Sequence, residues 1–247
     1  MIESRLKLKY GKEIPELSAQ YLMQCNYMNE GCDGGWSFFH GYMAENGHLV
    51  SEQCAPYQSK TKGLTCGQYS NCSTEAKIEK SYFIGGAYGE SSEKKMMKEI
   101  LHKGIVNGEL NVPRVFSFYQ QGILSNDHES KMSSYLEYSG VAASHKEAQQ
   151  QIGADSKSKA INDRDLEDYG VAWMNLNHSV VIFGWGIDKK GTKFWRVRNS
   201  YGTKWGMNGD FWVRRGENDF GIESETTAYD VLKCKPNNKT YVCTEDL

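Results

Sequence analysis

The sequence has no long hydrophobic run and no large excess of charge of either sign. Its 247 residues carry a formal net charge of −2, with a pI near 6.3. Because a membrane-spanning helix needs about 20 consecutive apolar residues, no segment is expected to cross a membrane. A nucleic-acid-binding protein usually has a strongly basic surface, which this charge balance does not predict. Neither membrane nor nucleic acid is therefore expected as a partner.

The sequence also lacks paired C-x-x-C motifs, although it contains seven cysteines. Five of them fall between Cys25 and Cys72, and two lie near the end of the chain, at Cys234 and Cys243. Structural zinc sites usually use C-x-x-C pairs, so this clustering favours a disulfide framework formed in an oxidising compartment. An odd number of cysteines leaves one thiol without a partner inside the chain.

The length fits one domain or two closely packed lobes, with helices first and strands later. Helices are expected over 1–10, 18–25, 36–46 and 91–103. The last helix has Ser91 or Ser92 as its cap and an apolar stripe expected to be buried, formed by Met96, Met97, Ile100 and Leu101. From Val106 onward the pattern changes to that of strands.

The segment 126–168 differs in composition from the rest of the chain. It is rich in Ser, Lys, Glu, Gln, Ala and Asp. Such a composition cannot bury enough apolar surface to order itself. We expect a solvated insertion, with a transient helix over 147–158 and, as the less favoured alternative, a regulatory or lid role.

The stretch from Asn177 to Gly216 contains the residues best suited to catalysis. His178 precedes an apolar run, and Asn199 ends a strand expected over 194–198, which a Gly-rich turn separates from another over 210–215. A side-chain oxygen that accepts the Nδ1–H of an imidazole fixes the tautomer and leaves Nε2 to exchange a proton with a nucleophile. The alternative interpretation is a structural histidine beside a turn asparagine.

These motifs resemble those of the papain-like cysteine peptidases. NHSVVIFGWG is similar to that family's catalytic-histidine strand, and RNSYGTKWGMNGDFWVRRG to its catalytic-asparagine strand and turn. ELSAQYLMQC is similar to one of its helices, and GCDGGW to the glycine segment of its substrate cleft. The spacing of QCNYMNEGCDGGW, CAPY, YFIGG and NDFGIES most resembles the dipeptidyl peptidase I branch, which includes cathepsin C and its parasite and protist relatives.

The resemblance implies an α+β fold of two lobes, one helical and one an antiparallel β-barrel. It implies a Cys-His-Asn mechanism in which His178 transfers protons and Asn199 orients it. Five residues would contribute to substrate binding, with the main chain of Gly35 pairing with the substrate backbone: Gly34, Gly35, Trp36, Tyr201 and Trp205. Of these, Tyr201 stands where the family has a tryptophan that covers the Asn–His hydrogen bond.

The resemblance also implies a nucleophilic cysteine that the sequence does not contain. The family signature C-G-[SA]-C-[WY] is absent. By alignment with the family helix, the nucleophile would lie about two helical turns before Met1. We therefore expect an N-terminally truncated peptidase, inactive by itself. The alternative is a non-catalytic pseudopeptidase that acts as a binding or regulatory protein.

The implied disulfides are Cys25–Cys66 and Cys54–Cys72, with Cys32 bonded to a cysteine outside the chain. Cys234 and Cys243 are spaced for a small loop of their own. No cofactor is expected. A chloride site of the cathepsin C type is doubtful, because the residues at two implied tyrosine positions are Phe38 and Phe83.

The expected organisation is a peptidase domain over 1–232 that lacks its N-terminal part, followed by a tail over 233–247. The expected partners are a peptide or protein substrate and the missing N-terminal segment or exclusion domain. The disulfide framework and the resemblance predict the secretory pathway, with a lysosome-like or vacuole-like compartment or the extracellular space as destination.

Overall fold

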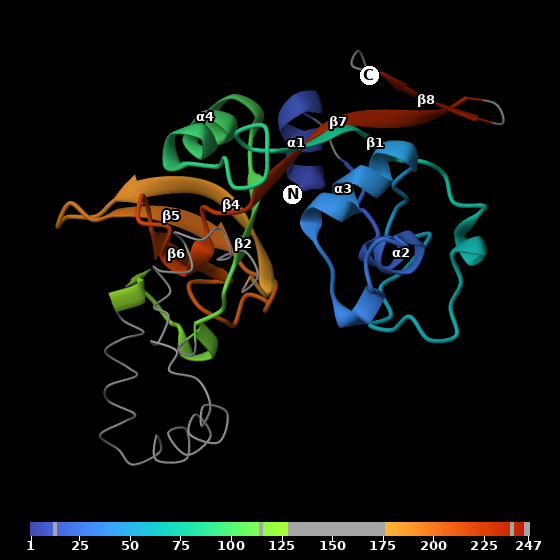
Figure 1. Ribbon diagram of the computed structural model, residues 1–247. Helices are drawn as coiled ribbons and strands as arrows, with labels where there is room; N and C mark the ends of the chain where they lie inside the picture. Colours follow the sequence, from blue (N-terminus) through green and yellow to red (C-terminus); the bar gives the residue numbers. More distant parts are fainter. Residues whose placement is uncertain (12–13, 114–115, 128–175, 238–239, 245–247) are drawn as a thin grey trace, which may run out of the picture. The chain divides into compact units, whose positions relative to one another are not determined.

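The computed structural model describes residues 1–11, 14–113, 116–127, 176–237 and 240–244 (Figure 1). These residues form two compact units. Unit 1 comprises Met1–Asn107 with Thr226–Leu247, and unit 2 comprises Gly108–Glu225. Nearly all of the expected insertion, including the helix expected over 147–158, lies outside the described residues.

The described residues of unit 1 include four α-helices close to the positions that the sequence predicts. They are α1 (Ile2–Tyr10), α2 (Ala19–Cys25), α3 (Ser37–Asn46) and α4 (Glu93–Lys103), with short 3₁₀ helices η1 (Gly31–Asp33) and η2 (Cys66–Tyr69) between them. None of the helices in the described ranges is both long and apolar enough to cross a membrane.

The ends of these helices follow from local chemistry. Gly11 ends α1 in the left-handed conformation, with φ 62°, and its N–H donates to the carbonyl of Lys7. Ser18 begins α2, because its hydroxyl accepts the N–H of Tyr21 at 2.8 Å. Ser92 has the same role in α4.

The predicted buried stripe of α4 is only partly correct. Met96 is fully buried, whereas Leu101 is 71% exposed. Five residues along a helix correspond to about 500°, so Leu101 points roughly 140° away from Met96. The sequence prediction was therefore wrong to include Leu101 in the buried face of this helix.

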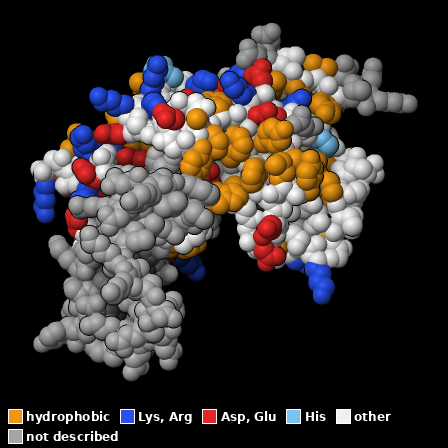
Figure 2. Space-filling view, in the orientation of Figure 1, with side chains coloured by type: hydrophobic (Ala, Val, Ile, Leu, Met, Phe, Trp, Pro, Cys, Tyr) orange, Lys and Arg blue, Asp and Glu red, His pale blue; other side chains and the backbone are white. Residues whose placement is uncertain are grey.

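Three strands of a larger sheet complete unit 1. Strand β7 (Thr226–Asn237) pairs antiparallel with β1 (Ala76–Phe83) and with β8 (Thr240–Thr244). Helix α3 packs on β1 and β7, and α1 packs on β7 (Figure 1). The core between them consists of Leu6, Ala44, Leu49, Ala76, Ile78, Tyr229 and Val231. Hydrophobic side chains also gather on the surface of unit 1 that displays α3 (Figure 2).

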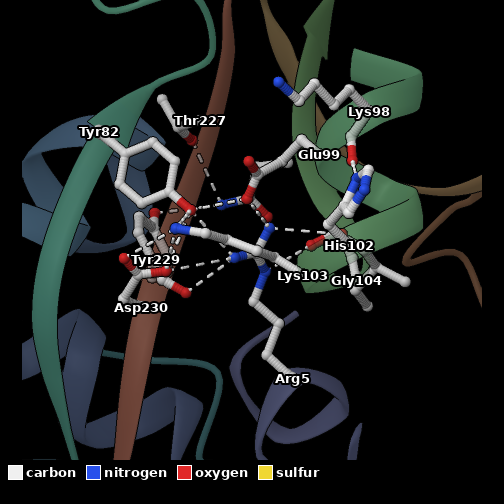
Figure 3. Close-up of polar contacts among 12 residues, drawn as sticks. Arg5, Tyr82, Lys98, Glu99, His102, Lys103, Gly104, Thr227, Tyr229 and Asp230 are labelled. Atoms are coloured by element: carbon white, nitrogen blue, oxygen red, sulfur yellow. Dashed lines mark hydrogen bonds and ion pairs between the residues drawn. The ribbon is translucent and has the colours of Figure 1, made fainter. Parts of the chain in front are cut away.

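A buried arginine connects the elements of unit 1 (Figure 3). Arg5 is only 3% exposed, and its guanidinium donates to Glu99 Oε1 at 2.8 Å and to the main-chain oxygen of Ile105 at 2.8 Å. It also donates to the main-chain oxygen of Tyr229 and to the hydroxyl of Tyr82. Because the partners lie on α4, β1, β7 and the link after α4, one side chain from α1 ties these elements together.

Unit 2 is a sheet built around three antiparallel strands. They are β4 (His178–Ile187), β5 (Lys193–Arg198) and β6 (Asp210–Arg214), which the sequence predicts within one residue at β5 and β6. Strand β2 (Val106–Leu110) enters unit 2 and precedes β4 in the sheet order, while β3 (Ile123–Leu124) runs parallel to β6. Among its described residues, this unit also includes the short 3₁₀ helices η3 (Phe116–Phe118) and η5 (Asp219–Gly221).

The expected β-barrel is not closed among the described strands. Their order in unit 2 is β2-β4-β5-β6-β3, an open arrangement with β3 at one edge. The β3 strand is two residues long, so it offers too few backbone groups to pair on both sides. The α+β class is confirmed, and the barrel description is replaced by a large, mostly antiparallel sheet.

Candidate active site

His178 and Asn199 lie at the same edge of the unit 2 sheet. His178 begins β4, and Asn199 directly follows the last residue of β5. The antiparallel register, in which Val181 faces Arg198, brings these ends together. Nε2 of the His178 ring lies 2.8 Å from Oδ1 of Asn199. The sheet thus joins two side chains that are 21 positions apart in the sequence.

The direction of this hydrogen bond follows from a second contact. Oδ1 of Asn199 also accepts the main-chain N–H of Ser200 at 2.8 Å, which identifies it as the acceptor atom of the amide. Nε2 of His178 must therefore donate, and Nδ1 is the basic nitrogen of the neutral ring.

The sequence-based expectation had the two ring nitrogens reversed. It placed Nδ1 against Asn199 and left Nε2 for the nucleophile, whereas the contact uses Nε2. Nε2 is the ring nitrogen farther from the backbone, so it is the one that reaches from β4 to the end of β5. Nδ1 is consequently the ring nitrogen that lies outside this contact.

Asn199 is buried and hydrogen-bonded through its backbone, but one polar atom of its side chain has no hydrogen-bond partner among the described residues. Its side chain is 8% exposed, and its N–H donates to the carbonyl of Gly209 at 2.9 Å. Its buried Nδ2 has no hydrogen-bond partner within the part of the chain that the structure describes. An unpaired buried amide costs about 1–3 kcal/mol, which is unusual for a residue that serves only a turn.

An aromatic cluster surrounds the imidazole. Phe116, which is fully buried, contacts the rings of His178, Tyr201 and Trp205 at centroid distances of 6.0, 5.9 and 4.8 Å. The Tyr201 ring lies 5.4 Å from that of His178 and is 49% exposed, so it separates the imidazole from solvent on one side. Trp205 is fixed by donation from its Nε1 to the carbonyl of Phe116 at 3.1 Å.

Sequence reasoning missed Phe116. It lies in η3, far from the His and Asn motifs, and no local pattern distinguishes it from Phe118 two positions later. The structure distinguishes them clearly, since Phe118 is 83% exposed.

The start of β4 is anchored to β2. Asn177 donates its N–H to the carbonyl of Leu110 at 3.1 Å, and its side-chain oxygen accepts the N–H of Val112 at 2.9 Å. The hydroxyl of Ser179 donates to Oε1 of Glu109 at 3.2 Å. His178 is therefore flanked in sequence by two residues that bind β2 or the segment that follows it.

Glu109 belongs to a buried pair of carboxyl groups that sequence reasoning did not find. Glu109 and Glu225 are each 3% exposed. Burial, together with the nearby charge of Glu109, raises the pKa of Glu225 to about 7. Two acidic residues separated by more than a hundred positions give no local signal of their proximity.

Gly34, Gly35 and Trp36 belong to unit 1, where Asn29 holds their backbone. Oδ1 of Asn29 accepts the N–H of Trp36 at 2.9 Å, and its Nδ2 donates to the carbonyl of the same residue. Gly35 has φ +156°, and a Cβ there would overlap the Asn29 side chain. The turn therefore requires glycine at Gly35, with an exposed backbone available to a ligand.

Six of the seven cysteines form the pairs Cys25–Cys66, Cys54–Cys72 and Cys234–Cys243. These six cannot be thiolate ligands of a metal. Cys32 is a free, exposed thiol in η1.

The residues at the implied chloride site do not fit that ion. Phe38 and Phe83 stack on each other at a centroid distance of 4.3 Å and an interplanar angle of 10°. Neither ring has a hydroxyl that could donate to an anion.

Comparison with known proteins identifies a family for this chain. The family model described as papain family cysteine protease matches residues 1–151 and 157–229. Cathepsin C of Schistosoma mansoni is 29% identical over 232 residues, which cover 93% of this chain and 43% of that protein. Procathepsin L of Mus musculus is 27% identical, with 94% of this chain and 56% of that protein covered.

Solved structures share the fold. The bromelain protease of Ananas comosus, in complex with the E64 inhibitor, matches with a TM-score of 0.63 at 22% sequence identity. The match covers 92% of this chain and 83% of the bromelain chain. Digestive procathepsin L 3 of Tenebrio molitor also has a TM-score of 0.63, at 23% identity, with coverage of 92% and 59%. The chain spans about half the length of the curated relatives that it matches.

Proposed function

Because the chain belongs to the papain family of cysteine proteases, we propose that it provides the proton-transferring part of a peptide-hydrolysing site. His178 acts as base and acid through Nδ1, and Asn199 fixes the ring. The observation that carries the proposal is the 2.8 Å contact between Nε2 of His178 and Oδ1 of Asn199. It leaves the basic nitrogen, Nδ1, outside the pair and available to exchange a proton.

The chemistry requires a thiolate. Nδ1 takes the thiol proton, the thiolate attacks the peptide carbonyl, and the amine leaves with the proton that Nδ1 returns. Water then hydrolyses the thioester with His178 again as base. Tyr201 and Phe116 shield the imidazole side of this site, which strengthens its hydrogen bond to Asn199.

The thiolate is proposed to come from a residue outside these 247. Unit 2, which carries His178 and Asn199, contains no cysteine, and the six paired cysteines cannot act as nucleophiles. Cys32 is free but lacks the family signature around it. The chain by itself is therefore expected to be inactive.

One comparison tests this assignment. The chain as given, and a longer gene product extended at its N-terminus, are assayed with a fluorogenic peptide and titrated with a thiol-alkylating inhibitor. The proposal expects turnover only in the extended protein, where alkylation of the nucleophile or His178→Ala abolishes it. In the chain as given, the inhibitor should label only the free thiol of Cys32. Activity of the chain as given would overturn the assignment of the thiolate.

Within the family, we propose the dipeptidyl peptidase I type of activity. Its support is the similarity to cathepsin C of Schistosoma mansoni over 93% of this chain. The extended protein should then release dipeptides from a substrate with a free amino terminus, and acetylation of that terminus should block cleavage. Equal cleavage of the acetylated substrate would identify an endopeptidase.

The cysteine inventory also supports a second candidate, a non-catalytic binding or regulatory protein of the same fold. An extended gene product that lacks a reactive cysteine and still binds peptides would establish it. For either candidate we propose the secretory pathway, with a lysosome-like, vacuole-like or extracellular destination, because three disulfides need an oxidising compartment to form.

A further inference from the structure

Two carboxyl groups are buried together beside the strand that begins with His178. Glu109 lies on β2, and Glu225 is the last residue before β7. The main-chain N–H of Glu109 donates to the carbonyl of Glu225 at 3.2 Å, so the two residues are adjacent. Oε2 of Glu225 is buried and has no hydrogen-bond partner among the residues that the structure describes.

Two buried anions at close range repel each other, and neither is stabilised by water. Burial first, and the charge of Glu109 second, raise the pKa of Glu225 from 4.5 to about 7. Glu225 therefore keeps its proton under mildly acidic conditions and becomes charged near neutral pH.

Two other acidic residues near Glu225 in the chain have partners of their own, and the buried guanidinium of Arg215 lies over the ring of Trp195. Asp219 binds the guanidinium of Arg214 at 2.6 Å, and Glu223 accepts the indole N–H of Trp195 at 2.7 Å. On β4, the group that faces Glu109 is the uncharged hydroxyl of Ser179. His178 is the titratable residue next to it in the chain.

One hydrogen bond connects the pair to the residue that follows the proposed catalytic base. Oε1 of Glu109 accepts the hydroxyl of Ser179, the residue after His178. The residue before His178, Asn177, is bonded to the carbonyl of Leu110 on the same strand β2. A displacement of Glu109 would therefore act on both sides of His178.

We propose that the Glu109–Glu225 pair is a pH-dependent positioning device: while it holds one proton it keeps β2 and the start of β4 together, and loss of that proton loosens the strand that carries His178. The functional meaning rests on the proposed role of His178. The tests below need no turnover, so they can fail or succeed independently of that role.

The sign of the stability effect follows from linkage. Between pH 4.5 and about 7, the folded protein keeps a proton that the unfolded chain releases. Stability therefore falls as pH rises through this window and is constant, with respect to this pair, above it. A difference of 2.5 pKa units corresponds to a change of about 300-fold in the unfolding equilibrium constant.

The first test is urea unfolding of the chain from pH 4.5 to 8. Glu225→Gln should be more stable relative to the parent as pH rises, by up to about 300-fold in the unfolding equilibrium constant at pH 7–8. Glu217→Gln, which changes an exposed carboxyl group of the same unit, should follow the parent at every pH. If the pH dependence of stability in Glu225→Gln matched that of the parent as closely as Glu217→Gln does, the proposal would be overturned.

The second test asks whether the pair acts on β4. In a His178→Ala background, which removes the imidazole's own titration, the backbone amide signal of Ser179 is followed by NMR against pH. We expect a step near pH 7 that disappears in Glu225→Gln and persists in Glu217→Gln. A Ser179 signal that does not respond to the pair would show a local stability effect without any coupling to β4.

Discussion

Oδ1 of Asn199 accepts two hydrogen bonds at 2.8 Å, one from Nε2 of His178 and one from the N–H of Ser200. The backbone donor fixes which amide atom faces the imidazole, and the amide in turn fixes which ring nitrogen carries the proton. Under the proposed function this relationship gives the two side chains unequal roles, with His178 exchanging the proton and Asn199 orienting the ring.

Substitution of the two residues in the extended, active protein should therefore have unequal effects. His178→Ala should lower kcat by several orders of magnitude, as removal of a catalytic base does. Asn199→Ala removes one orienting hydrogen bond, so a loss of about ten- to a few hundred-fold is expected. Ser200→Ala is the control, since it keeps the backbone donor. Equal losses for His178→Ala and Asn199→Ala in a folded protein would contradict a purely orienting role.

Phe116 should support both the fold of unit 2 and the imidazole. Phe116→Ala leaves a cavity in the aromatic cluster and should lower the free energy of unfolding by about 3–5 kcal/mol. Phe118→Ala, in the same 3₁₀ helix but with a side chain that is 83% exposed, should change it by less than about 0.5 kcal/mol. Urea unfolding of both variants measures the contrast. Similar values would mean that η3 is not packed as described.

Gly35 should not tolerate a side chain. Gly35→Ala introduces a Cβ that overlaps Asn29 at a positive φ, so we expect a loss of about 1–3 kcal/mol in stability. Gly67→Ala is a matched control, because the nearest atom to its Cβ would be 3.9 Å away. Calorimetry measures the unfolding of both variants. A larger loss of stability for Gly67→Ala than for Gly35→Ala would contradict the packing of Gly35 against Asn29.

Arg5 should contribute far more to stability than an exposed arginine with an equally short ion pair. Arg5→Met leaves Glu99 without its buried partner and should destabilise unit 1 by about 3–5 kcal/mol. Arg198→Met breaks a 2.6 Å pair with Asp210, but Arg198 is 62% exposed, so less than about 1 kcal/mol is expected. Thermal unfolding of the two variants tests the difference, and comparable shifts in Tm would refute the role of burial.

The sequence by itself determined the features that depend on neighbouring residues. Ser18, Ser92 and Gly11 mark helix ends because capping acts within a few residues of the chain. The strands around Asn199 follow from aromatic and branched runs with alternate burial, as at β6. The family motifs indicated His178 and Asn199 as candidate site residues, although neither motif gives the distance between the two side chains.

The tertiary structure alone decided what depends on residues far apart in the chain. It placed Nε2 of the His178 ring, and not Nδ1, against Asn199, because the register of β4 and β5 determines which ring nitrogen reaches the amide. It exposed Leu101, buried Phe116 and left the unit 2 sheet open in the described residues. It also placed Glu109 beside Glu225, where burial and the charge of Glu109 raise the pKa of Glu225 above its value in water. Local spacing cannot predict such effects, because each arises from a contact that exists only once the chain has folded.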